Sequence, residues 1–221
     1  MNLIRFAERM KIVFTKGQYS PEYVNFYMRN FGVSPFTNCL KKTFSHYLSP
    51  FYVKDAPVIP TSLDIKFGET PFGFRFEEML KMKGYPNCFT VDNVESDCLK
   101  VISYKETVIK SSMNVMYFFL NNCFFFGEYR FSDVTFLNVD GVIHTLLKRY
   151  KVNVPDKSDT FFIGDPSGNK IYYVFNGITV SIYYYSRLNT EINKSLDTYM
   201  NRKEVSDEDG NDLGSLLARH F

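Results

Sequence analysis

The sequence predicts an α+β protein in which N-terminal helices precede two helix-plus-three-strand units that form one antiparallel sheet. Residues 1–50 carry apolar side chains at helical spacing, whereas the apolar runs after residue 60 alternate as they do in strands. The chain contains 23 Phe and 16 Tyr, side chains that suit pleated, half-buried surfaces. Two hairpin signals, Asn121-Asn122 and Asn176-Gly177, occupy equivalent places in the two units.

The N-terminal helical segment spans residues 1–55. Its first helix is predicted by the apolar spacing of "IRFAERMKIVF". A second helix begins with Ser20 as N-cap and Pro21 at its first position, and ends at Gly32. A third is expected after Ser34. From Pro50 onward, three closely spaced prolines predict an extended connector.

An α+β domain is expected over residues 60–202, with the first unit at 60–135. This unit begins with a short strand near Ile65 and continues with a helix at about 73–83 that Gly84 and Pro86 end. The stretch "DCLKVISYKETVI" is the next strand, and a hairpin turns at Asn121-Asn122.

The second unit, residues 138–190, repeats this order. A helix over 140–150 has one apolar stripe, a turn follows at 165–169, and a hairpin turns at Asn176-Gly177. A further weak helix is expected at 188–202. Matched order in the two units predicts a divergent internal duplication, so their backbones should superpose.

The stretch "IKFGET…MLKMKGYP" resembles the opening of helix-then-meander units in β-lactamase-inhibitor-protein-like and small outer-membrane-lipoprotein assembly domains. The resemblance covers about residues 70–187, although the second unit lacks the Gly-x-Pro stop. It implies an α+β scaffold that presents one sheet face to protein partners, and it implies no catalytic residue. Six residues carry it: Ile65, Gly68, Thr70, Leu80, Gly84 and Pro86.

The most aromatic stretch is "NVMYFFLNNCFFFGEYRF", residues 114–131. Alternation about Asn121-Asn122 sorts its side chains into two faces. The predicted core face holds Met116, Phe118, Leu120, Cys123, Phe125, Tyr129 and Phe131. The other face holds Tyr117, Phe119, Phe124, Phe126, Glu128 and Arg130. Either another element covers this second set, or it forms an exposed aromatic patch.

The candidate partner-binding residues lie on the outer face of the last hairpin. Tyrosine offers a large rigid contact area with a polar tip, which is typical of protein-binding surfaces. We expect Tyr172 to lie opposite Ser181 and diagonal to Tyr183, so that the rings cluster. The predicted site comprises Tyr172, Tyr183, Tyr185, Lys170 and Arg187.

Composition and charge exclude several classes of protein. The 45% hydrophobic and 23% charged residues are typical of a folded chain rather than a disordered one. A net charge of +2 is too small for a generic nucleic-acid binder. The charge is uneven, however, with eight basic against three acidic residues in 1–60. An acidic, solvated and mobile tail is expected at 203–221, which has two basic and five acidic residues.

No pattern of catalytic, metal-binding or cofactor-binding residues is present. The three histidines, His46, His144 and His220, are scattered, and no phosphate-binding loop occurs. With no signal peptide and no apolar run of about 18 residues, a cytoplasmic protein without a membrane partner is expected. Four free thiols are therefore predicted, at Cys39, Cys88, Cys98 and Cys123.

The sequence favours non-enzymatic protein binding. The specific hypothesis is an inhibitor or immunity-type protein that covers its partner, a toxin or enzyme, with an aromatic sheet face. Two alternatives stay open: an enzyme of unrecognised type with a pocket between sheet and helices, and a nucleic-acid-binding accessory protein that uses the basic N-terminal helices.

Overall fold

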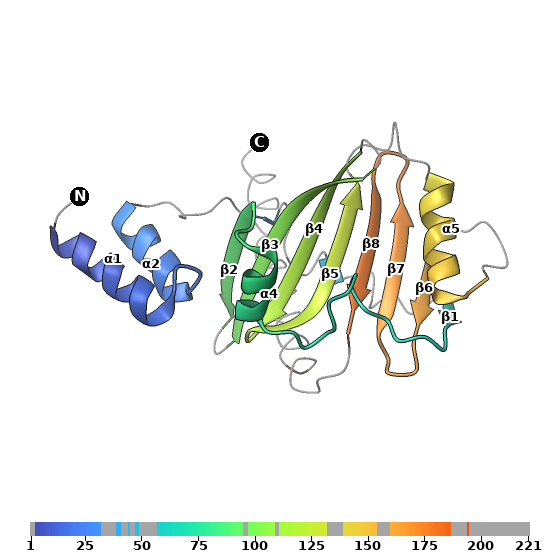
Figure 1. Ribbon diagram of the computed structural model, residues 1–221, viewed down its shortest axis with the longest axis horizontal. Coiled ribbons are helices and arrows are strands. Elements are labelled where there is room, and N and C mark those ends of the chain that lie inside the picture. Colours follow the sequence, from blue (N-terminus) through green and yellow to red (C-terminus); the bar gives the residue numbers. More distant parts are fainter. Residues whose placement is uncertain are drawn as a thin grey trace, which may run out of the picture.

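The protein folds into one large sheet with helices on one side and a helical pair at one end (Figure 1). The structure, a computed structural model, describes residues 3–31, 39–40, 44, 47–48, 57–94, 97–108, 111–131, 139–153, 160–186 and 194. The helices are α1 (Leu3–Lys16), α2 (Pro21–Phe31), α4 (Phe76–Lys83) and α5 (Val139–Tyr150). The strands are β1 (Val58–Pro60), β2 (Cys88–Val94), β3 (Asp97–Val108), β4 (Ser111–Leu120), β5 (Cys123–Phe131), β6 (Thr160–Gly164), β7 (Lys170–Phe175) and β8 (Val180–Tyr185).

The eight strands lie in the order β1-β6-β7-β8-β5-β4-β3-β2. Two meanders, β2–β5 and β6–β8, meet where β5 pairs with β8. The α+β class is confirmed, but a purely antiparallel sheet is wrong, because β1 pairs with β6 in parallel. The chain leaves β1 and builds the whole first meander before it returns to β6, and parallel neighbours require such a long crossover.

One face of the sheet, here called the helix-covered face, packs against α4 and α5. Phe76 and Met79 of α4 and Leu146 and Tyr150 of α5 enter the same hydrophobic cluster. The segment between β1 and α4 crosses this face and is anchored at both ends. The Ile65 amide donates to Asp165 Oδ2 at 2.9 Å, and the Gly73 amide donates to the Phe124 carbonyl at 2.8 Å.

This crossing segment corrects one sequence prediction. The short strand is Val58–Pro60 rather than a stretch near Ile65, which is buried without belonging to a strand. The predicted end of α4 is confirmed, since Gly84 has φ +78° and its amide donates to the Leu80 carbonyl.

The hairpin turn at Asn121-Asn122 is confirmed, with φ of +50° and +67° at the two asparagines. The predicted faces beyond it are wrong. Phe119 pairs with Phe124 but Phe118 pairs with Phe126, so Phe125 is an extra residue in β5. This β-bulge reverses the alternation after it. Tyr129 and Phe131 therefore join the helix-covered face, whereas Phe126, Glu128 and Arg130 lie on the second face with Met116 and Phe118.

The last hairpin turns through a four-residue loop, Asn176 to Thr179, rather than through two residues. Phe175 pairs with Val180, and Tyr172 therefore lies directly opposite Tyr183, not opposite Ser181. The register differs from the expectation by two residues. Since side chains alternate with a period of two, the predicted faces of β7 and β8 are nevertheless correct.

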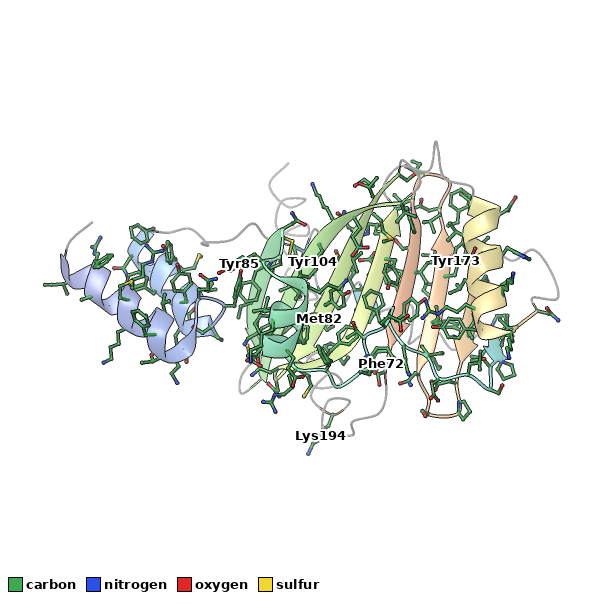
Figure 2. All side chains as sticks on the ribbon, in the orientation of Figure 1. Phe72, Met82, Tyr85, Tyr104, Tyr173 and Lys194 are labelled. Atoms are coloured by element: carbon green, nitrogen blue, oxygen red, sulfur yellow. A yellow bond between two sulfur atoms is a disulfide. The ribbon has the colours of Figure 1, made fainter. Side chains whose placement is uncertain are left out.

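Helices α1 and α2 form a pair that extends beyond the β2 end of the sheet (Figure 1). The predicted start of α2 is confirmed, because Ser20 Oγ accepts the Tyr23 amide at 3.2 Å. The pair meets the sheet through Tyr19, whose ring contacts Phe76, Phe89 and Tyr85. Tyr85, labelled in Figure 2, lies at this junction. The predicted helices near 34–48 and 188–202 and the acidic tail lie largely or wholly outside the described residues.

The two halves share the order helix, then strands. The first unit, however, contains the strand β2, which was not predicted, so α4 is followed by four strands and α5 by three. Superposition of the two units stays a prediction.

Candidate functional site

The second face of the sheet carries a row of aromatic rings that crosses four neighbouring strands. Phe162 of β6, Tyr172 of β7, Tyr183 of β8 and Phe126 of β5 form this row, which we call the aromatic row. Their successive ring centroids lie 4.7, 6.0 and 6.0 Å apart with interplanar angles of 26°, 16° and 28°. Near-parallel rings on paired strands hold each other in fixed positions, so the row is rigid, and Tyr172 and Tyr183 are its partly exposed members.

The structure brings four of the five predicted site residues together on this face. Tyr172 and Tyr183 belong to the row and are half-buried, and Lys170 is half-buried with its Nζ 5.7 Å from the Phe162 ring centroid. Tyr185 is only 4% exposed and packs in the core of this face. Arg187 lies outside the described residues. The open part of the predicted site is thus Lys170, Tyr172 and Tyr183.

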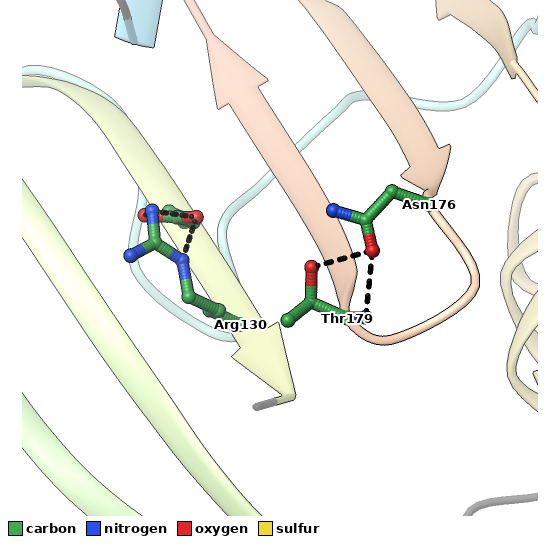
Figure 3. Close-up of polar contacts among 4 residues, drawn as sticks. Arg130, Asn176 and Thr179 are labelled. Carbon is green, nitrogen blue, oxygen red and sulfur yellow. Dashed lines mark hydrogen bonds and ion pairs between the residues drawn. The ribbon is translucent and has the colours of Figure 1, made fainter. Parts of the chain in front are cut away.

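A buried ion pair lies beside the row. Glu128 is fully buried, and Arg130 donates from Nε to its Oε1 at 2.7 Å and from Nη2 to its Oε2 at 3.0 Å (Figure 3). Burial raises the pKa of the Glu128 carboxyl, although Arg130 and the hydroxyls of Ser181 and Tyr183 oppose this rise. Two charge-assisted hydrogen bonds hold the Glu128 carboxylate in place. The ion pair therefore gives Tyr183 a fixed neighbour on this face of the sheet.

Residues from the N-terminal third of the chain cover the β4–β5 side of this face. The Phe44 ring lies 5.4 Å from Phe118 and 6.3 Å from Phe126, and the Tyr47 ring lies 5.6 Å from Phe118. The Arg130 guanidinium lies 5.5 Å from the Tyr47 ring centroid. Both faces of the central strands are therefore buried, and the second set of aromatic side chains forms no exposed patch. Tyr117, Phe119 and Phe124 face the helices, and Phe126 is buried in contact with Phe44.

A disulfide attaches this covering segment to the sheet. Cys39 is bonded to Cys88 of β2 with a Cα–Cα distance of 5.4 Å, and the Cys39 amide donates to Thr90 Oγ1 at 2.8 Å. The prediction of four free thiols is wrong, because only Cys98 and Cys123 are free. The two partners are 49 residues apart in sequence, so no local spacing indicated the pairing.

Burial shifts two titratable side chains of the sheet toward their neutral forms. Burial raises the pKa of Tyr183 to about 12, with a further contribution from Glu128, so its hydroxyl keeps its proton at neutral pH. Burial likewise raises the pKa of the Cys98 thiol, which opposes formation of a nucleophilic thiolate. His144 is exposed on α5. Within the described ranges, no three His, Cys, Asp or Glu side chains are grouped so that they could hold a metal ion.

Sequence reasoning missed Phe162 and Phe126 as members of the row, and the Glu128–Arg130 pair beside it. Glu128 and Arg130 are two residues apart on one strand, a spacing that puts opposite charges on the same face. That spacing was a usable signal for the pair. No local pattern identifies Phe126, because the bulge at Phe125 decides which face it occupies.

Comparison with known proteins adds no relative. The chain matches no protein-family model, no curated protein and no solved structure at a significant level. In the described part of the chain, none of the helices has an apolar stretch that would reach across a bilayer.

Proposed function

We propose that this chain is a non-enzymatic protein-binding protein that engages another protein through the open part of the aromatic row. The observation that carries the proposal is the stacked pair of Tyr172 and Tyr183, whose centroids lie 6.0 Å apart and whose rings both remain partly exposed. Rigid tyrosines lose little side-chain entropy on binding, and aromatic anchors of this kind carry much of the affinity in many interfaces.

Two neighbours support the same surface. Lys170 adds a positive charge at one edge, and Phe162 on the neighbouring strand stacks beside Tyr172 with ring centroids 4.7 Å apart. The resulting surface is aromatic and bordered by a cation, which suits a protein partner that presents apolar side chains next to a carboxylate.

In the specific form of the proposal, the partner is an enzyme or toxin that this chain inhibits by covering a functional surface. No cofactor takes part. A cytoplasmic location stays a prediction, and the Cys39–Cys88 disulfide counts against it, because disulfides persist mainly in oxidising compartments.

A pair of charge reversals tests the proposed surface. Lys170→Glu changes the edge of the aromatic row, and Lys148→Glu makes the same change on α5, against the opposite face. A photo-crosslinking amino acid at position 172, with a control at the exposed Ile178, identifies the partner. We expect a crosslink from position 172 alone, and weaker binding of the purified partner after Lys170→Glu but not after Lys148→Glu.

Truncation separates binding from folding. Tyr172→Ala should weaken binding by about thirtyfold, the typical effect of losing a central aromatic anchor. Tyr172→Phe should retain most of the affinity, because it keeps the ring. If Tyr172→Ala lowers the melting temperature sharply while binding by the folded fraction is unchanged, the row is structural and the proposal is wrong.

A further inference from the structure

Helix α1 turns apolar side chains outward, away from its partner helix. Ile4 is 74% exposed, Phe6 48% and Phe14 80%. With 100° between successive residues, Ile4, Ala7 and Phe14 lie on one side of the helix. The helical pair extends past the end of the sheet (Figure 1), and the three side chains of this side are all exposed.

Three charged side chains of α1 contact α2. Glu8 forms an ion pair with Arg29, and Lys16 forms one with Glu22. The Arg9 guanidinium lies 5.6 Å from the Tyr27 ring centroid. A surface helix of a self-contained protein normally buries its apolar stripe and exposes its polar one. In α1 much of the apolar surface is instead left outside, which makes this side of the helix a candidate interaction surface.

The charge of the outward surface is positive. Lys11 lies within the apolar stripe and is exposed. It forms no ion pair with any residue that the structure describes. Glu8, the single acidic residue of α1, is already paired with Arg29. The occupant of this surface must therefore combine apolar groups with negative charge.

We propose that α1 lies in the interface of an anionic lipid bilayer, with Ile4, Ala7 and Phe14 inserted among the acyl chains. The long stem of Lys11 lets its ammonium reach the headgroups from within the stripe. Apolar insertion together with basic residues is the pattern by which interfacial helices bind anionic membranes. The proposal departs from the sequence-based expectation that the chain has no membrane partner.

The size of the surface favours lipid over a second copy of the chain. A 14-residue helix is about 21 Å long and about 10 Å wide, so one face offers roughly 200 Å². A stable protein–protein interface typically buries about 800 Å² on each partner. Insertion into a bilayer has no such minimum area, because each apolar side chain and each cation adds to the binding separately.

Vesicle sedimentation of the full chain tests the proposal. The probes are vesicles of phosphatidylcholine alone and vesicles of equal parts phosphatidylcholine and phosphatidylserine. We expect binding to the anionic vesicles that decreases with added salt, and little binding to the neutral ones. Phe14→Ser should lower the partition coefficient about tenfold or more, and Lys11→Glu about fivefold or more.

Ile178→Ser is the matched control, because Ile178 is 73% exposed and lies on the β7–β8 loop. It should leave the partition coefficient unchanged, and none of the variants should change the melting temperature appreciably, since all alter exposed side chains. Absence of binding to anionic vesicles, or equal binding by wild type and Phe14→Ser, would overturn the proposal. If light scattering then showed a dimer that Phe14→Ser dissociates, the surface would belong to a second copy; otherwise it would belong to a protein partner.

Discussion

Gly127 shows how closely the helix-covered face is packed. A Cβ built on this glycine would lie 2.7 Å from two carbon atoms of the Phe67 ring. Phe67 is fully buried, stacks on Tyr129 at 4.3 Å and contacts Tyr117 and Tyr184 edge-on. The ring therefore has little room to move. Glycine is required here by the approach of a side chain rather than by its backbone angles.

Gly127→Ala should destabilise the protein by about 1–3 kcal/mol, because the added methyl group overpacks a filled core. Urea unfolding of Gly127→Ala, Phe67→Leu and the double variant measures the coupling. The smaller leucine makes room for the methyl group, so the double variant should lose less stability than the two single variants together. Simple additivity would show that the methyl group meets no obstruction from Phe67.

The Glu128–Arg130 pair links charge to the pH dependence of stability. Burial raises the pKa of the folded Glu128 carboxyl, whereas Arg130 lowers it. A carboxyl whose folded pKa is raised contributes stability that is present below its unfolded pKa, near 4.5, and is lost as the pH rises through the folded pKa. Removing Arg130 raises the folded pKa further and enlarges this loss.

Arg130→Leu should therefore cost about 3 kcal/mol or more at pH 7, because it leaves a buried carboxyl without its partner. The cost should be smaller at pH 4, where Glu128 is largely protonated in both states. Denaturant unfolding of wild type and variant at the two pH values measures the difference. Glu128→Leu combined with Arg130→Leu should recover much of the loss. An equal cost at both pH values would contradict the assigned role.

At the scale of elements, the local sequence predicted the hairpin turns but not the β-bulge at Phe125. Asn121 and Asn122 tolerate positive φ, and Asn176 Oδ1 accepts the Thr179 amide at 2.8 Å and its hydroxyl at 3.0 Å (Figure 3). These are short-range preferences that the sequence reveals. The bulge at Phe125 has no such signal, because it is set by how four consecutive apolar residues divide between two cores.

Pairings between distant segments could not be predicted from local sequence patterns either. The β1–β6 ladder, in which Val58 pairs with Phe162, and the Cys39–Cys88 bond both depend on the complete sheet. The aromatic row was predicted in part, since the alternation of β7 and β8 put Tyr172 and Tyr183 on one face. Phe162 and Phe126 come from strands whose position in the sheet the sequence could not give.

The Cys39–Cys88 disulfide leads to a prediction about how the segment around Cys39 is attached to β2. Thiol titration of the denatured, unreduced protein should return two thiols, Cys98 and Cys123. A crosslink between residues 49 apart restricts the unfolded chain, so Cys88→Ser should cost about 4 kcal/mol or somewhat less. Urea unfolding of Cys88→Ser and of the control Cys123→Ser, whose thiol is free, measures this cost. Four titratable thiols would show that the covering segment is held by packing alone.

At the scale of the whole molecule, β5 and β8 are the shared centre of the two meanders. Each is the last strand of its meander, and they run antiparallel to each other. In such an arrangement the two meanders are related by a rotation of about 180° around an axis perpendicular to the sheet. Since α4 and α5 then fall on the same face, as observed, the topology favours the predicted duplication.

This organisation predicts an uneven distribution of stability. Strands β4, β5 and β8 have partners on both edges, and most of their side chains are buried on both faces. Their backbone hydrogen bonds should open only when the whole molecule unfolds. Helix α1, by contrast, buries little apolar surface, and the helical pair is joined to the sheet through the contacts around Tyr19.

Hydrogen–deuterium exchange with mass spectrometry should show this difference directly. Peptides from 113–131 and 180–185 should exchange slowest, with protection close to the global free energy of unfolding. Peptides from α1 should exchange much faster in free protein, because opening the helical pair leaves the sheet intact. Equal protection of α1 and β5 would show that the helical pair and the sheet unfold as one unit. The apolar surface of α1 would then be part of a cooperative domain rather than of a separately opening element.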